Sequence, residues 1–388
     1  MTRSARLAFM VGTLAGAASV FAQVSRDAAR AESEHFAASA RLLTSAIAQD
    51  APSVRVTGQL QFRYVINHRD QTPGAEDDAV GFQTRRSKFK LDGTIADRWK
   101  YKVSTAFSRS SGTGSLEDAY VRYIADDGWE FTFGKFKLPY AREESVSSSA
   151  QLTADRSVTN AFFSLKRSQA VRAAWEGESA RFAVAFSDGS RADKTDFISA
   201  DEADFALTAR GEYRFAGNDW GAFKQFTSFR GSSYAAMAGA AVHYQSGGET
   251  FGTADEDFTG LTADLSLLGD GFNAFAAILW QRVEPAGGPA LENTGLIVQG
   301  GWFVDPAWEL FARWDAILSD QVDDFSTVTV GVNRYLLPES HAAKFTGDVQ
   351  FFLDEQASTD APASTATGLQ ASTRDGQWAL RLQMQLLF

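Results

Sequence analysis

The sequence contains no cysteine among its 388 residues. Disulfide frameworks, thiolate zinc sites, iron–sulfur clusters and cysteine nucleophiles are therefore excluded. Histidine is also scarce, because the chain has four in all, and they lie far apart: His35, His68, His243 and His341. None stands at ligand spacing from another, so we expect no metal site and no cofactor.

The chain also lacks a basic excess and any familiar catalytic motif. It has 37 Lys and Arg against 48 Asp and Glu, which argues against binding to nucleic acid. GxSxG, HExxH and P-loop patterns are missing, so we expect no enzyme and no catalytic residues. Proline is sparse at 8 residues, whereas Phe (31), Trp (9) and Gly (32) are plentiful. This profile indicates many β-strands joined by tight turns.

The first residues have the layout of a targeting segment. Arg3 and Arg6 precede an apolar stretch from Leu7 to Ala18, and small residues follow it, so residues 1–22 are predicted to be a secretory signal peptide. No later stretch approaches the length of a transmembrane helix. Residues 23–52 are rich in Ala, and a short helical extension is expected there, as a coiled-coil stub, a pore plug or a linker.

From residue 53 onward every second residue tends to be apolar. In 54–64 and again in 378–388, apolar side chains alternate with Arg, Gln and Thr. This period of two predicts strands with one apolar and one polar face. Large aromatics stand at both ends of several apolar faces, as in Trp99 to Phe107, which resembles the aromatic girdles of a membrane barrel. The predicted fold is all-β, a transmembrane β-barrel over 53–388; a soluble β-protein is the alternative.

Sixteen strands are expected in this antiparallel barrel. They lie near 54–66, 82–95, 99–108, 116–125, 129–135, 170–176, 181–187, 205–215, 234–245, 259–268, 272–283, 294–303, 308–317, 326–336, 343–353 and 377–388. Their connections alternate between long and short, as outer loops and periplasmic turns do. Residues 216–233 break this rule, because a long stretch stands where a short turn is due.

The polar faces of the first five predicted strands carry an excess of cations. With the apolar faces turned outward, the expected pore-lining residues are Arg55, Arg63, Arg86, Lys88, Lys90, Lys100, Lys102 and Arg122. The longest connection, 136–169, supplies the expected constriction-loop residues Lys137, Arg142, Arg156, Lys166 and Arg167. Cations along a narrow aqueous pore favour anions. By parity Arg85 falls on the lipid-facing side, unless a bulge turns it inward.

Several stretches resemble the phosphate-selective porin O and P family. They are Gln83–Gly93 (QTRRSKFKLDG), Trp99–Lys102, Leu116–Tyr123 (LEDAYVRY), Phe133–Glu144 (FGKFKLPYAREE), Asp155–Ser157 and Asn333–Tyr335. The resemblance is densest over 82–160. It implies a trimeric outer-membrane porin of sixteen strands, with an inward-folded third loop and a channel that favours phosphate.

The expected function is therefore passive diffusion of small hydrophilic solutes through an outer-membrane porin that favours anions such as phosphate. The alternative is a structural or ligand-binding barrel with an occluded lumen. The expected partners are outer-membrane lipid and lipopolysaccharide, small anionic solutes and two further copies of the chain in a homotrimer. The expected location is the outer membrane of a Gram-negative-type cell, reached by export through the signal peptide.

Overall fold

A computed structural model describes residues 52–69, 78–192, 196–200, 202–250, 255–320, 323–355, 368–370, 372 and 374–388. The predicted signal peptide and, apart from Pro52, the predicted extension 23–52 lie outside these residues. The chain divides into a barrel unit, Val54–Gly93 with Trp99–Phe388, and a second unit, Met1–Ser53 with Thr94–Arg98. Within the described ranges, no helix is long and apolar enough to cross a membrane.

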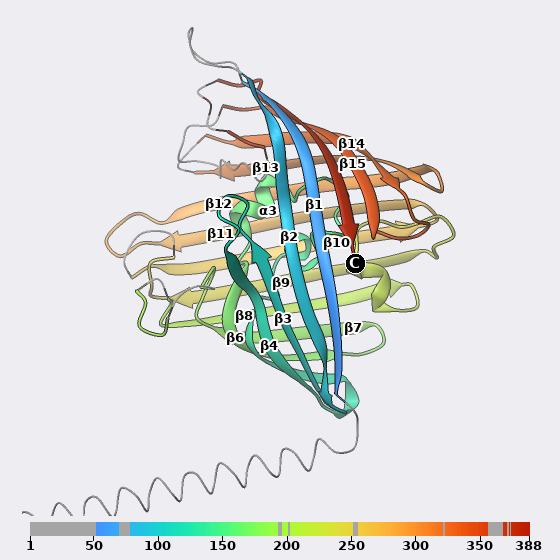
Figure 1. The fold of residues 1–388 in the computed structure, drawn as a ribbon. Helices are drawn as coiled ribbons and strands as arrows, with labels where there is room; N and C mark the ends of the chain where they lie inside the picture. Colours follow the sequence, from blue (N-terminus) through green and yellow to red (C-terminus); the bar gives the residue numbers. More distant parts are fainter. Residues whose placement is uncertain are drawn as a thin grey trace, which may run out of the picture. The chain divides into compact units, whose positions relative to one another are not determined.

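The described residues form sixteen strands that close into a barrel, in which each strand pairs with its neighbours in sequence and β1 pairs with β16 (Figure 1). The strands are β1 Ser53–His68, β2 Asp78–Ala96, β3 Trp99–Phe107, β4 Gly114–Ile124, β5 Trp129–Lys137, β6 Arg167–Glu176, β7 Ala180–Ser187, β8 Phe205–Ala216, β9 Ala235–Ser246, β10 Asp257–Gly269, β11 Phe272–Glu284, β12 Leu291–Asp305, β13 Trp308–Ser319, β14 Phe325–Tyr335, β15 Ala343–Phe352 and β16 Trp378–Leu387. The predicted barrel of sixteen antiparallel strands is confirmed.

The pairing of β1 with β16 shows why the alternating sequence forms this wall. Arg381 and Gln385 on β16 point into the barrel and are buried, whereas Leu382 and Leu386 are 38% and 42% exposed on the outside. Across the seam, the amide of Gln61 donates to that of Gln385 at 2.6 Å inside the barrel. Polar residues thus satisfy one another within the wall, and the outer face is left to apolar side chains.

Two irregularities turn additional charges inward. Between β3 and β4, Ser104 pairs with Asp118 while Thr105 pairs with Leu116, so Glu117 is the extra residue of a β-bulge. As a result, Glu117 and Asp118 both face the interior, although they are consecutive. On β2, Arg85 and Arg86 also point inward together, because both bind Asp155. The parity-based expectation that Arg85 faces lipid was therefore wrong.

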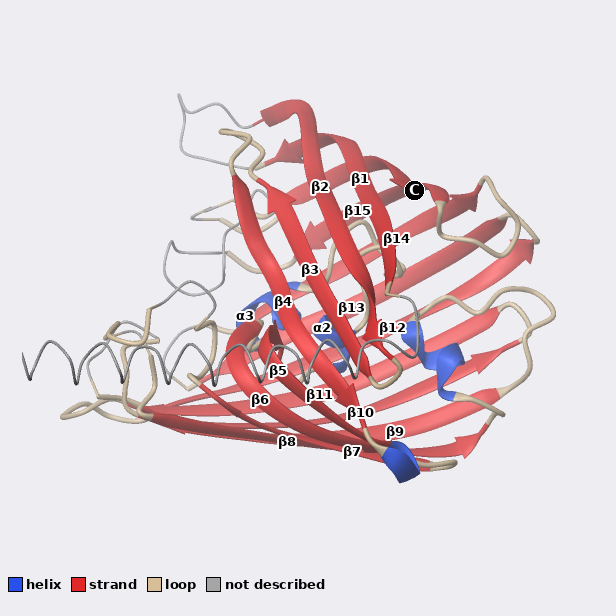
Figure 2. Cartoon of the chain, turned by 60° about the horizontal axis from the view of Figure 1, so that its bottom comes forward, coloured by secondary structure: helices blue, strands red, loops and turns tan. Residues whose placement is uncertain are grey.

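The connection between β5 and β6, residues 138–166, folds inside the ring of strands, where it forms the short helices α2 (Arg142–Ser145) and α3 (Val158–Phe163) (Figure 2). Its apolar side chains pack on inward-facing apolar residues of β10–β15 to form one buried cluster. The members from the connection include Leu138, Tyr140, Val146, Leu152, Val158, Phe163 and Leu165, and those from the strands include Phe258, Phe275, Leu279, Ile297, Phe311, Phe325 and Phe352. We call residues 138–166 the inner loop.

The outward register of β16 can be tested by charge substitution at two depths. Leu382 lies near the middle of the strand, so Leu382→Arg is expected to lower the free energy of unfolding by roughly 2–4 kcal/mol in lipid vesicles. Leu386 lies near the end of the same strand and on the same face, so the matched variant Leu386→Arg should cost about 0–1 kcal/mol. Unfolding by urea measures both values. Equal costs at the two positions would contradict this depth assignment.

Candidate functional site

Two cavities follow the wall formed by the first six strands. The larger, of about 1060 Å³, extends to Ser108–Ser110 in the connection between β3 and β4. The smaller, of about 630 Å³, extends to Leu387 and Phe388 at the opposite ends of the strands. Both are lined by Lys90, Lys102, Tyr120 and Arg122. The two cavities lie along one side of the barrel, between the wall and the inner loop, and we call them together the passage.

The larger cavity is strongly basic. Its lining includes three carboxylates, those of Glu117, Asp118 and Glu144. Against these stand twelve cationic side chains: Arg85, Arg86, Lys88, Lys90, Lys102, Arg109, Arg122, Lys137, Arg156, Lys166, Arg167 and Arg172. Because the protein as a whole is acidic, this local excess reflects placement and not composition. Field lines are focused in such a cleft between low-dielectric walls, which strengthens its attraction for anions.

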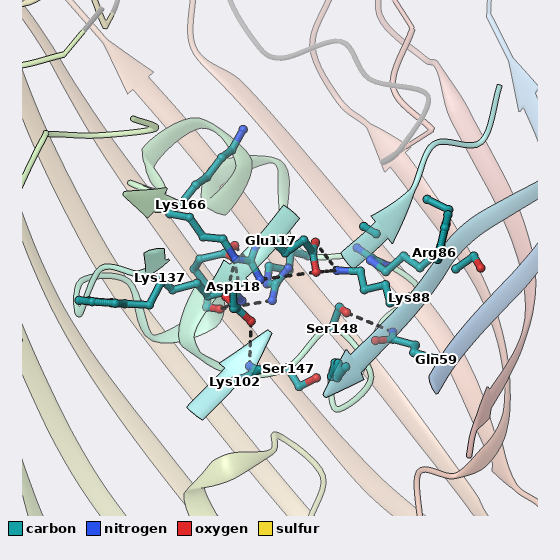
Figure 3. A pocket seen from close by; sticks show the side chains of 18 of the residues that line it. Gln59, Arg86, Lys88, Lys102, Glu117, Asp118, Lys137, Ser147, Ser148 and Lys166 are labelled. Carbon is teal, nitrogen blue, oxygen red and sulfur yellow. Dashed lines mark hydrogen bonds and ion pairs between the residues drawn. The ribbon is translucent and has the colours of Figure 1, made fainter. Parts of the chain in front are cut away.

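The bulged pair on β4 holds part of this cation array in place (Figure 3). Lys88 Nζ donates to both oxygens of Glu117, at 2.6 and 2.8 Å. The Asp118 carboxylate forms an ion pair with Lys102 Nζ at 2.8 Å and accepts a hydrogen bond from Arg167 Nε at 2.7 Å. Each carboxylate therefore fixes long cationic side chains at defined positions, and the cations still outnumber the carboxylates.

Asp155 of the inner loop joins the loop to the wall through three arginines. Its two carboxylate oxygens accept hydrogen bonds from Arg63 Nη1 at 2.7 Å, from Arg85 Nε and Nη2 at 2.8 Å each, and from Arg86 Nη2 at 2.6 Å. Burial alone would raise the pKa of Asp155, but the nearby Arg85, Arg86 and Arg63 guanidinium groups hold that pKa well below its usual range. Asp155 is thus a permanently charged anchor, which we call the triple-arginine anchor.

A second carboxylate of the inner loop, that of Glu144, forms ion pairs with Lys137 and Arg156 at the base of the loop. Lys137 Nζ lies 2.9 Å from Glu144 Oε1, and Arg156 Nε lies 3.4 Å from Oε2. Burial would raise the pKa of Glu144, but Arg156 and Lys137 lower it below its usual value. The adjacent Glu143 faces the other way, where it accepts from the backbone N–H of Ser157 at 2.8 Å. Burial raises the pKa of Glu143, against the opposing effect of Arg313.

The structure distributes the residues expected at the pore as follows. Of the wall residues, Arg86, Lys88, Lys90, Lys102 and Arg122 line the larger cavity, Arg55 and Lys100 line the smaller one, and Arg63 is fully buried behind Asp155. Lys137 ends β5 and Arg167 begins β6, so these two pair at the base of the inner loop instead of lying within it. Lys137, Arg167, Arg156 and Lys166 line the larger cavity.

Arg142 differs from the other loop candidates. It is 4% exposed, lines neither cavity, and donates to the backbone oxygen of Phe223 on the far side of the inner loop. Burial lowers the pKa of Arg142 to about 10, although Glu212 and Asp264 act in the opposite direction. We therefore assign Arg142 to the packing of the loop and not to the cavity surface.

Sequence reasoning missed two cations and one carboxylate that line the larger cavity: Arg85, which parity placed toward lipid, Arg109 and Glu117. Arg172 follows the strand alternation, which places it inward, and it also lines this cavity. Arg85 and Glu117 were hidden by the irregularities on β2 and β4, and Arg109 lies in a connection where alternation carries no information. Among the described residues, no group of three or more His, Asp or Glu is placed to hold a metal ion.

Comparisons with solved structures agree on the fold. The anion-selective porin from Comamonas acidovorans superposes with a TM-score of 0.62 at 14% identity, covering 87% of this chain and 100% of that one. The outer membrane channel DcaP of Acinetobacter baumannii superposes with a TM-score of 0.58 at 14% identity, covering 87% of this chain and 98% of that one. OmpT of Vibrio cholerae in its trimer form superposes with a TM-score of 0.55 at 14% identity, covering 87% of this chain and 100% of that one. A search among curated sequences found no match.

A closed barrel of sixteen strands, with a loop folded inside it and a basic cavity along one wall, defines the class of outer-membrane porins. The chain belongs to the phosphate-selective porin O and P family, whose family model matches residues 54–388. The resemblance noted in the sequence is confirmed, and the protein is a porin.

Proposed function

We propose that this porin conducts small hydrophilic solutes passively and favours anions, with phosphate among them, along the passage beside β1–β6. The observation that carries this proposal is the ratio of twelve cationic side chains to three carboxylates in the larger cavity. An anion that leaves bulk water there loses hydration but gains attraction from fixed cations through a partly low-dielectric wall. The cationic residues that line the passage act as an array and not as a single binding site.

We further propose that the chain assembles as a homotrimer, contacts outer-membrane lipid and lipopolysaccharide, and is exported through residues 1–22. The trimer form of OmpT supports the first of these by analogy. The exposed apolar side chains that alternate along the outer faces of the strands support the second. The layout of the first 22 residues supports the third.

Reversal potentials across planar bilayers test the anion preference. Under a salt gradient near 0.15 M, the wild-type channel should show the sign of an anion-selective pore. The matched control removes three exposed carboxylates from the connections between β13 and β14 and between β15 and β16, as Asp323→Asn, Glu355→Gln and Asp375→Asn together. None of them lines the passage, and charges beyond about 8 Å are screened at this ionic strength, so the control should keep the wild-type sign. A cation-selective wild-type channel would refute the proposal.

A second function has one observation in its favour. The inner loop and its buried cluster fill the side of the barrel lined by β10–β15, which suits a structural or ligand-binding barrel with an occluded lumen. Single-channel recording separates the two functions, because an occluded barrel passes no steady current.

A further inference from the structure

The connection between β8 and β9 is long at the end of the barrel where the other connections are short. Residues 217–234 form it, with a short helix η3 at Trp220–Lys224. We call it the floor segment. Four of its five large aromatic residues are buried: Trp220 is 6% exposed, Phe223 1%, Phe226 2% and Phe229 7%, whereas Tyr234, next to β9, is 54% exposed. A solvent-exposed turn does not bury aromatic side chains in this way, so the segment packs on the barrel interior.

One end of the floor segment is fixed to β11–β14 and their turns. Phe229 packs on Tyr335 and Phe303, with ring centroids 5.0 and 5.6 Å apart. Its carbonyl accepts from the N–H of Gly271 at 3.2 Å. The Thr227 hydroxyl lies 2.9 Å from that of Tyr335. These contacts tie the segment to the wall that lies opposite the basic passage.

Its middle contacts the inner loop. The N–H of Phe226 donates to the carbonyl of Ala150 at 3.2 Å, and the Arg142 guanidinium donates to the carbonyl of Phe223. Arg142 also lies 5.7 Å from the centroid of the Phe226 ring. The Phe226 ring in turn packs on inward-facing Phe275 of β11, with centroids 4.8 Å apart. The floor segment therefore supports the inner loop from the short-turn end.

This side of the barrel holds carboxylates that line neither cavity. Asp264, Glu309, Asp315 and Asp348 point inward from β10, β13 and β15, and each is 6% exposed or less. Glu309 contacts the floor segment, because the Thr227 hydroxyl donates to its carboxylate at 3.5 Å. The same carboxylate accepts from Tyr335 at 2.6 Å, Asn333 at 3.1 Å and Asn273 at 2.9 Å. Asp264, Asp315 and Asp348 pair with Arg210, Arg313 and Arg381, so charge on this side is balanced. Water reaching these groups would create a second route without the cation excess of the passage, and such a route would admit cations more readily than the passage does.

We propose that the floor segment is a selectivity-determining element: it closes the carboxylate-bearing side of the barrel from the short-turn end and so confines conduction to the basic wall. This inference rests on the proposed function for its effect on ion selectivity. Its effect on water access does not depend on that proposal.

Removal of the segment is feasible because the strands that it joins are already adjacent. Ala216 of β8 pairs with Ala236 of β9, and Gly217 has a positive φ of 101°, which suits a tight turn. A variant in which a short glycine-containing turn replaces 218–234 should therefore keep the barrel closed. In planar bilayers it should show a higher conductance than the wild type and a reversal potential shifted toward cation permeation.

A thiol placed beneath the segment measures water access directly. The chain has no cysteine, so Ser266→Cys introduces a single one. Ser266 is 2% exposed, its hydroxyl has no hydrogen-bond partner among the described residues, and it pairs with Met237 and Phe275 next to the segment. A charged methanethiosulfonate reagent should modify Ser266→Cys slowly in the full chain and rapidly in the deletion variant. The control Ser147→Cys, on the larger cavity, should react rapidly in both.

The outcomes separate this inference from the proposed function. If wild type proves cation-selective, but deletion still raises conductance and thiol access, the anion preference fails and the occluding role stands. If an assembled deletion variant matches wild type in conductance and Ser266→Cys reactivity, the floor segment does not occlude the barrel. Should the deletion variant not assemble, Phe226→Ala, which removes the ring between Arg142 and Phe275, provides the same test. It should raise Ser266→Cys reactivity, and an unchanged rate would overturn the inference.

Discussion

Asp155→Asn is expected to destabilise the porin more than any other single substitution in the inner loop. The change removes the one charge that three arginines share, and leaves the buried Arg63 and Arg86 and the partly exposed Arg85 close together. Breaking a buried ion pair from one side costs about 3–5 kcal/mol. Asp155 belongs to the inner loop, and the arginines belong to β1 and β2. Loss of their interaction should therefore allow the inner loop to detach from that wall.

Two measurements check this result. Urea unfolding in lipid vesicles should show the loss of stability, and single-channel records should show larger and noisier currents from a loop that is no longer held. Ser148→Ala is the matched control, because it removes one neutral contact between the same loop and β1, the 3.2 Å hydrogen bond from Gln59. It should cost about 1 kcal/mol. Similar losses in the two variants would mean that the triple-arginine anchor adds no special stability.

The second large effect concerns selectivity, and the structure shows which cations to remove. Lys90, Lys100 and Arg172 make no ion pair with a carboxylate among the described residues, and all three line the passage. Their replacement by Gln therefore orphans no carboxylate. A unit charge about 4 Å from a passing anion contributes roughly 1 kcal/mol even in bulk water. The triple variant should lower the anion-to-cation permeability ratio by roughly tenfold or more.

A reversal potential under a salt gradient measures this ratio. The control with Asp323, Glu355 and Asp375 neutralised changes the net charge by the same amount in the opposite direction, and should leave the ratio near the wild-type value at 0.15 M salt. A larger change in that control than in the Lys90, Lys100 and Arg172 variant would place selectivity at those three exposed carboxylates. The basic passage would then not be the selectivity filter.

The strand pattern could be read from the sequence because burial in a barrel wall has a period of two. The alternation around Arg381 and Leu382 fixed β16 and its register. The same rule failed at Glu117, since a bulge adds one residue and reverses the parity after it. It also failed at Arg85, which points inward beside Arg86. No local pattern in the sequence marks either departure. The consequence is large, because Arg85 and Glu117 are both charged and both line the larger cavity.

The position of the passage was beyond sequence reasoning for a different reason. Inward-facing Phe275, Leu279 and Phe311 make their strands apolar on both faces, and the partner that covers them is a loop more than one hundred residues earlier. Long-range packing of this kind leaves no local signature. The sequence therefore predicted a basic wall and a long loop, but not that the loop would occupy the opposite side and leave that wall open to water.

The apolar cluster beneath the inner loop also bears on the order of assembly. A membrane barrel usually keeps its apolar surface for lipid, yet this one holds a compact core of the kind found in water-soluble proteins, enclosed by its own sheet. The inner loop contacts β1 and β2 on one side and β10–β16 on the other. The buried cluster therefore cannot pack completely until the first and last strands pair. Gln61 and Gln385, 324 positions apart, close that seam. Interior packing is therefore a late step, and a nascent barrel must carry the loop as hydrated chain until closure.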